Sequence, residues 1–262
     1  MFKIFISLLF SITIIIITTI GNHIVVVSGQ QTTTPNNNNN NSIPCNKNGE
    51  KQVDALLARV LTFGDSGREF PESQDQIPAF CNETQLLVKS VEQYVKKCTK
   101  TQLSKQLFSV YVFTIKSQLT QLCKTKPTQR LRDMLSASKC VNRAKPVFTK
   151  CVQRTVDHLQ RIRLLASDTM KIPHLCCEYN TNKQCNREGS AKITDCTDRD
   201  MEIVDRFVDS VAGNSMNLLC GDYDESSDKC KSLPKLPKNI KKPQKFKSFF
   251  IPSIEVISSL QS

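Results

Sequence analysis

The stretch KIPHLCCEYNTNKQC, from Lys171 to Cys185, gathers residue types that bind metals or catalyse reactions: one histidine, two adjacent cysteines and a third cysteine. Structural zinc sites usually hold two ligands on a C-x-x-C pair, and the chain has no such pair. Adjacent half-cystines cannot easily bridge to each other, so Cys176 and Cys177 are expected to form disulfides with two different elements. We interpret the stretch as a disulfide junction.

Candidate catalytic groups are few. Beyond the first 30 residues the chain has two histidines, His158 and His174; both are expected to be solvated, and neither has an identifiable serine or cysteine nucleophile beside it. The run GDSG (64–67) matches four residues of the nucleophile loop of chymotrypsin-like proteases, but the helical surroundings favour a helix-terminating turn. The sequence therefore predicts no catalytic residue and a non-enzymatic protein. A hydrolase site assembled only in the fold is the alternative.

One acidic run between Cys220 and Cys230 has the alternating spacing of the first ligands in a calcium loop. The sixth place of that loop, normally glycine, is Ser227, and the twelfth, normally glutamate, is Leu233. A solvated acidic turn is therefore favoured over a metal site, and no cofactor is expected, because glycine motifs for nucleotides are also absent. The calcium candidates are Asp222, Asp224, Ser226 and Asp228.

The first 29 residues read as a secretory signal: Lys3, a long apolar run, and small residues at Val27 and Gly29 that suit cleavage. In a chain bound for an oxidising compartment, an even number of cysteines implies a disulfide framework. The spacing leaves the connectivity of the expected six bridges open. The twelve half-cystines are Cys45, Cys81, Cys98, Cys123, Cys140, Cys151, Cys176, Cys177, Cys185, Cys196, Cys220 and Cys230.

Residues 30–44 form a Thr- and Asn-rich stretch with too little apolar surface to offset the entropy of ordering it, so a disordered leader is expected there. Asn40 and Asn82 begin N-glycosylation sequons, which a secreted chain can use. Both asparagines are therefore predicted glycosylation sites.

Residues 45–230 show helical spacing of apolar side chains nearly throughout. Val53, Leu57 and Val60 illustrate it, and Gly64 follows where a left-handed helix cap is expected. His174 is placed in a connector after Pro173, and no alternating strand pattern is evident. We therefore expect an all-α fold: a single disulfide-stapled bundle of about six helices.

The basic charge is concentrated near the C-terminus. The net charge of +12 becomes +11 without Lys3, and eight lysines lie between Lys229 and Lys247 with no acidic residue among them. This excludes the whole-surface basic field of a nucleic-acid-binding protein and indicates a basic tail over 231–262, with a short amphipathic end starting near Pro252. That end is expected either to pack on the body or to touch a membrane. Candidate contacts to anionic glycans or lipid headgroups are Lys235, Lys238, Lys241, Lys242, Lys245 and Lys247.

The order FPESQDQIPAFC, KIPHLCC, GDYDESSDKC, LPKLP and KFKSFFIP, with Tyr94 to Cys98 between the first two, resembles secreted cysteine-rich helical proteins predicted in mites and insects. It is more distantly similar to the cysteine-rich domain of nematode secreted proteins that include a chondroitin-proteoglycan member. The nearer resemblance implies no assigned activity and no site residues. The distant one implies association with extracellular matrix, although the chain has no Ser-Gly pair in an acidic setting to accept a glycosaminoglycan.

These observations predict a secreted, extracellular protein that acts by binding. The expected partner is a small apolar ligand held between helices, or an anionic extracellular surface met by the tail; nucleic acid is not expected. A membrane-active or defence protein is a further alternative, and the oligomeric state stays open.

Overall fold

The computed structural model describes residues 42–62, 65–124, 126–213, 216, 219–223, 227–238, 240 and 243–261. These residues form eight α-helices joined by turns and short 3-10 or π-helical segments, with no β-strand among them. The predicted all-α fold is confirmed, with eight helices in place of about six. The predicted signal, 1–29, and residues 30–41 of the predicted leader lie outside the described residues.

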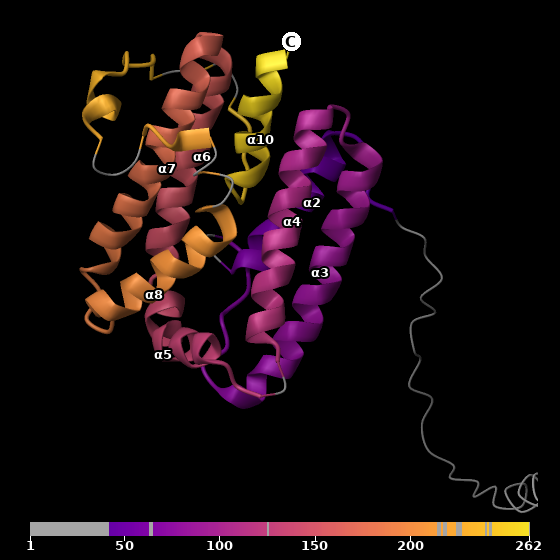
Figure 1. Cartoon of the computed structure of the whole chain (residues 1–262), viewed down its shortest axis with the longest axis vertical. Helices are drawn as coiled ribbons and strands as arrows, with labels where there is room; N and C mark the ends of the chain where they lie inside the picture. The colour runs from indigo at the N-terminus through magenta and orange to yellow at the C-terminus, as the bar shows by residue number, and fades with distance from the viewer. Residues whose placement is uncertain are drawn as a thin grey trace, which may run out of the picture. The chain divides into compact units, whose positions relative to one another are not determined.

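Helices α2 (Lys47–Leu61), α3 (Ile77–Cys98) and α4 (Gln102–Leu122) form the first of two layers, on the right of Figure 1. The Asn46 side chain starts α2 by accepting hydrogen bonds from two backbone N–H groups, as an N-cap does. The helix ends where Thr62 adopts a left-handed backbone with φ of 61°. Thr62 thus takes the cap position that the sequence assigned to a glycine two residues later.

Helices α5 (Gln129–Arg143), α6 (Lys145–Leu165), α7 (Asp168–Ser190) and α8 (Asp198–Val208) form the second layer, on the left of Figure 1. Within it α6 packs along α7, and α5 packs against α8. A π-helical turn, η2 (Asp209–Gly213), continues α8 and packs against α4 of the first layer.

The prediction of a connector around Pro173 was wrong, because this proline lies inside α7. Proline removes only one helix hydrogen bond near the start of a helix, and the remaining turns of this 23-residue helix stay bonded. The apolar spacing that reveals most helices is missing here, because the inward positions of α7 carry polar side chains such as Glu178. The internal proline and the inward polar side chains thus both hide α7 from sequence analysis.

All six disulfides lie within a layer, and none joins the two layers. Two bridge the helices of the first layer, Cys45–Cys98 and Cys81–Cys123. The other four tie the second layer to itself and to the loop that follows it: Cys140–Cys196, Cys151–Cys185, Cys176–Cys220 and Cys177–Cys230. The contact between the layers, apart from the chain that runs through both, is therefore non-covalent.

The C-terminal helix α10 (Phe250–Ser258) lies between the layers, shown in yellow in Figure 1. It contacts α6 and α7 on one side and α2 and α4 on the other. Phe250, Ile254 and Ile257 are each at most 6% exposed. The amphipathic end was expected either to pack on the body or to touch a membrane. In the structure it packs on the body. The boundary expected at Cys230 does not separate a tail from the body, since residues 42–262 form one compact unit.

A strap of irregular backbone, residues 243–249, leads into α10 and is held by buried side chains. The Asp54 carboxylate of α2 accepts hydrogen bonds from the backbone N–H of Lys247 (2.5 Å) and Ser248 (3.1 Å), and from the Ser248 hydroxyl (2.6 Å). Burial raises the pKa of Asp54, while these three hydrogen bonds act in the opposite direction. Asp54 therefore anchors the strap to the first layer.

Two glutamines of α6 anchor the same strap to the second layer. Gln160 accepts a hydrogen bond from the backbone N–H of Gln244 (2.6 Å) and donates one to its carbonyl (2.7 Å). Gln153 donates to the carbonyl of Phe246 (2.8 Å). Side chains thus supply the partners that a backbone without regular secondary structure lacks.

Replacing Asp54 with alanine leaves two backbone N–H groups and a hydroxyl of the strap without their acceptor. We expect Asp54→Ala to lower the free energy of unfolding by about 2 kcal/mol, measured by urea denaturation. The matched control is Asp157→Ala, an exposed aspartate on α6, which is expected to change stability by less than about 0.5 kcal/mol. Equal effects of the two substitutions would contradict the anchoring role.

Candidate functional site

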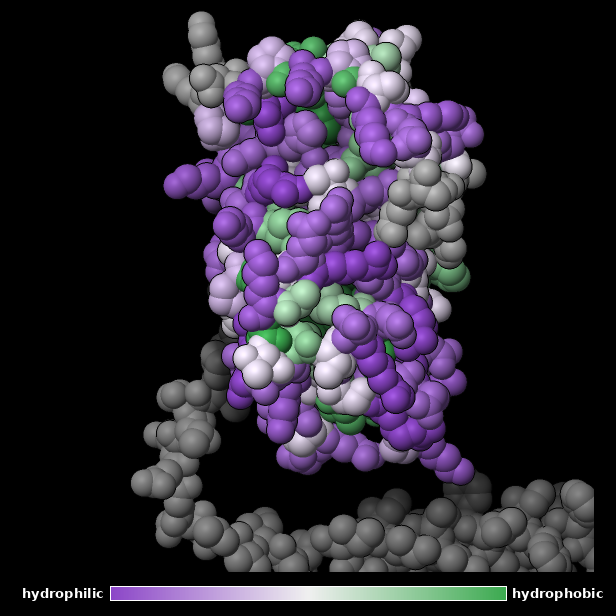
Figure 2. Space-filling view, turned by 90° about the vertical axis from the view of Figure 1, so that its left-hand side faces the viewer, coloured by the Kyte–Doolittle hydropathy of each residue, from purple (hydrophilic) through white to green (hydrophobic). Residues whose placement is uncertain are grey.

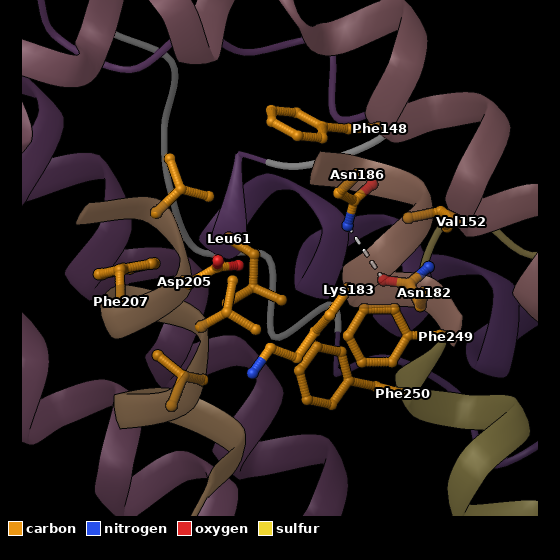
Figure 3. Close-up of a pocket in the computed structure, with 13 residues that line it drawn as sticks. Leu61, Phe148, Val152, Asn182, Lys183, Asn186, Asp205, Phe207, Phe249 and Phe250 are labelled. Atoms are coloured by element: carbon orange, nitrogen blue, oxygen red, sulfur yellow. Dashed lines mark hydrogen bonds between the residues drawn. The ribbon is translucent and has the colours of Figure 1, made fainter. Parts of the chain in front are cut away.

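A mainly apolar cleft lies between the layers and is here called the seam cleft (Figure 3). Counted with the open solvent at its mouth it measures about 610 Å³, but the enclosed space that a water molecule can occupy is only about 40 Å³. Nine of its lining side chains are apolar and come from α2, α6, α8, η2, the strap and α10. Phe249 and Phe250 close it on the side of α10, opposite Phe207 and Leu61 in Figure 3.

Two smaller hollows adjoin the seam cleft. One shares the lining residues Asn182 and Phe249 with it. The other shares Leu61, Phe207 and Val211. Each encloses only about 20 Å³. The space between the layers is therefore filled by α10 over one part and incompletely packed next to it.

Four polar side chains lie along the inner face of α7 at intervals of four residues: His174, Glu178, Asn182 and Asn186. Side chains four apart lie above one another on a helix, so they form one stripe. The spacing is visible in the printed sequence, but the assignment of a connector around Pro173 concealed it. This stripe is a candidate functional feature that sequence reasoning missed.

The lower part of the stripe is linked by hydrogen bonds into what we call the polar relay. The Thr155 hydroxyl, on α6, donates to Oε1 of Glu178 at 2.8 Å and accepts from Nδ2 of Asn182 at 2.9 Å. Nδ2 of Asn186 then donates to Oδ1 of Asn182 at 3.1 Å, the dashed line in Figure 3. Oδ1 of Asn186 is buried and accepts no hydrogen bond from any described residue.

The two histidines lie at the upper end of the stripe. Nδ1 of His158 contacts Oε2 of Glu178, whose side chain is only 3% exposed. The prediction of a solvated His174 was wrong: this residue is 6% exposed, because it faces inward from a helix. Burial, and then the proximity of His158, lower the pKa of His174.

The cluster of His158, Glu178 and Thr155 does not have the order of a catalytic triad. In a triad the hydroxyl bonds the imidazole, which takes its proton, whereas the Thr155 hydroxyl donates directly to the carboxylate. Every cysteine is in a disulfide, so no thiolate is present as a nucleophile. Ser66 of the GDSG run is buried, and its hydroxyl donates to the carbonyl of Arg68 within the turn. The described residues therefore do not form the hydroxyl–imidazole–carboxylate order of an acyl-transfer triad.

The calcium candidates are not brought together in the described part of the chain. Asp222 pairs with Lys229 at 3.6 Å and Asp228 pairs with Lys231 at 2.6 Å. Asp224 and Ser226 lie outside the described residues. No group of three or more possible metal-binding His, Cys, Asp or Glu residues occurs within the described ranges.

The lysines that were predicted to contact anionic groups differ in their surroundings. Lys247 pairs with Asp65 at 3.0 Å, whereas Lys235, Lys238 and Lys245 are exposed. Lys241 and Lys242 lie outside the described residues.

The disulfide junction at Cys176 and Cys177 is confirmed, since these residues bridge to Cys220 and Cys230 respectively. Consecutive positions on a helix point about 100° apart, which directs the two sulfur atoms to different segments.

Glycosylation of Asn82 stays a prediction, to be checked by the mass lost on glycosidase treatment. The residue is exposed on α3, while the hydroxyl of its sequon partner Thr84 is buried and donates to the carbonyl of Phe80. Asn40 lies outside the described residues.

Comparison with family models, curated proteins and solved structures finds no match for this chain. Within the described ranges, no helix combines the length and apolar character needed to cross a bilayer. The surface on the α7 and α8 side is mainly hydrophilic, with small apolar patches (Figure 2).

The lowered pKa of His174 predicts a pH dependence of stability. Its pKa in the folded protein lies below the ordinary value of 6.5, so the unfolded chain binds more protons as the pH falls through 6.5. We expect the free energy of unfolding to decrease between about pH 7 and pH 5, and His174→Leu to flatten that decrease. Chemical denaturation across this range checks it; equal slopes in the two proteins would contradict it.

Proposed function

We propose that this chain is a secreted, non-enzymatic extracellular protein that holds a small apolar ligand in the seam cleft. The observation that carries the proposal is the cleft itself, whose apolar lining is interrupted by only four polar side chains: Asn182, Lys183, Asn186 and Asp205. Ligand sites are commonly apolar hollows of about 300–1,000 Å³ in which a few polar groups fix the orientation of the ligand. The seam cleft matches that description in lining. Because its enclosed space is only about 40 Å³, a ligand must separate the layers to enter.

The arrangement of the disulfides supports ligand entry at the seam. The bridges restrain each layer, and because none crosses the seam, a small separation of the layers breaks no covalent bond. Local opening of a protein occurs where the contacts are non-covalent and incompletely packed. The cleft and its two neighbouring hollows mark such a place.

The extracellular part of the proposal is supported by the cysteines. All twelve are paired, and stable disulfides are characteristic of oxidising compartments. The signal-like first 29 residues agree with this assignment.

Filling the seam cleft should abolish ligand binding. Diphenylhexatriene, a slender hydrocarbon that fluoresces in apolar surroundings, serves as the probe. Val208 is half-buried and lines the cleft, so we expect Val208→Trp to weaken probe binding at least tenfold, in a fluorescence titration. Leu86→Trp, at a side chain on α3 that is 66% exposed, is the matched control and is expected to bind as the unmodified protein does.

Failure of the unmodified protein to bind the probe would count against the proposal. Binding that both tryptophan variants retain equally would place the site elsewhere.

An anionic extracellular surface is the second candidate partner. It is favoured by Lys235, Lys238 and Lys245, which are exposed and have no acidic partner among the described residues. The matrix association implied by the distant resemblance would use the same side chains.

We expect replacement of these three lysines by glutamine to lower the salt concentration at which the protein elutes from immobilised heparin, since fewer charge contacts remain. The matched control replaces three exposed lysines of the body, Lys89, Lys96 and Lys139. Equal shifts in both triple variants would indicate net charge alone and contradict a specific role of the segment.

A further inference from the structure

The polar relay has a defined direction, because a carboxylate accepts hydrogen bonds and does not donate them. Oε2 of Glu178 contacts His158, and Oε1 accepts a hydrogen bond from the Thr155 hydroxyl. The Thr155 oxygen then acts as an acceptor, which fixes the amide of Asn182 with its NH₂ toward Thr155.

The hydrogen-bond direction set at Glu178 also determines the orientation of the Asn186 amide. With its NH₂ committed to Thr155, Asn182 presents its carbonyl oxygen to Asn186, so Asn186 must turn its own NH₂ toward Asn182. Its carbonyl oxygen is left over at the cleft, pointing toward Phe148 in Figure 3. The orientation of this amide therefore follows from the network and not from a choice between two equivalent flips.

The two charged side chains that line the cleft, Lys183 and Asp205, each have an ionic partner. Lys183 pairs with Asp209 at 3.1 Å, outside the cleft lining. Asp205 accepts a hydrogen bond from Arg187 and adds negative charge to this side of the cleft. Oδ1 of Asn186 is thus a buried acceptor beside the cleft, and a ligand reaches it only when the layers separate.

We infer that the ligand of the seam cleft is a slender apolar alcohol, whose hydroxyl donates to Oδ1 of Asn186. This inference rests on the proposed function and names its ligand class. A buried acceptor discriminates strongly against an analogue that lacks the matching donor, because that analogue leaves the acceptor unpaired. A carboxylate is also disfavoured, because it is itself a hydrogen-bond acceptor and has no hydrogen to donate to Oδ1 of Asn186.

The test compares three competitors that displace diphenylhexatriene: 1-decanol, decyl methyl ether and decanoate. Their alkyl chains differ by at most one carbon, and only the alcohol donates a hydrogen bond at neutral pH. We expect 1-decanol to displace the probe at a concentration at least about tenfold lower than the ether, and decanoate to be the weakest.

Two variants tie that preference to the relay. Asn186→Leu removes the acceptor, and the ratio between alcohol and ether should fall to within about twofold. Thr155→Val removes the link that orients Asn182, and the ratio should decrease because the amides are then free to flip. Gln184→Leu, an exposed position on α7 outside the cleft lining, is the control that keeps the ratio.

Circular dichroism and the melting temperature establish that each variant is folded. Equal displacement by alcohol and ether in the unmodified protein, or a preference that survives Asn186→Leu, would overturn this inference while leaving the proposed function intact. Absence of binding by the probe and by all three competitors would overturn both.

Discussion

Phe250, Ile254 and Ile257 of α10 lie between two helical layers that share no disulfide, and the rest of the structure depends on this contact. Burial of each such side chain stabilises the fold by about 1.5–3 kcal/mol, which makes α10 a principal link between the layers. The strap that positions α10 bonds to Asp54 on one layer and to Gln160 on the other. A segment with the composition of a mobile basic tail thereby becomes part of the core.

The same seam explains where a binding site can form. Disulfides stabilise each layer without requiring close packing at the seam, so hollows remain beside α10. The polar stripe of α7 runs along this space, and a buried polar stripe is costly unless its members bond to one another. Glu178, Thr155 and Asn182 satisfy that condition, while the outermost amide oxygen, on Asn186, faces the cleft with no partner among the described residues. The packing defect and the unpaired acceptor occur at one place, which is why we assign the ligand there.

Sequence patterns predicted the helical class, the pairing of all twelve cysteines and the separate bridges of Cys176 and Cys177. They did so because apolar spacing and oxidised cysteines are local signals that tertiary contacts rarely override. Helix α7 was missed because Pro173 and inward polar residues both oppose the usual helical pattern. The docking of α10 and the polar relay were not predictable, since Asp54 and Lys247 are 193 positions apart and only the fold brings them together. The pairing of cysteines within layers depends on the same long-range geometry.

The most direct test of the two-layer account is a disulfide map of unreduced protein recovered from the medium of secreting cells, obtained by proteolysis and mass spectrometry. The account predicts that the four cysteines from Cys45 to Cys123 pair only with one another, and that the eight from Cys140 to Cys230 do likewise. A bridge linking the two sets, or thiols that alkylate without reduction, would contradict it.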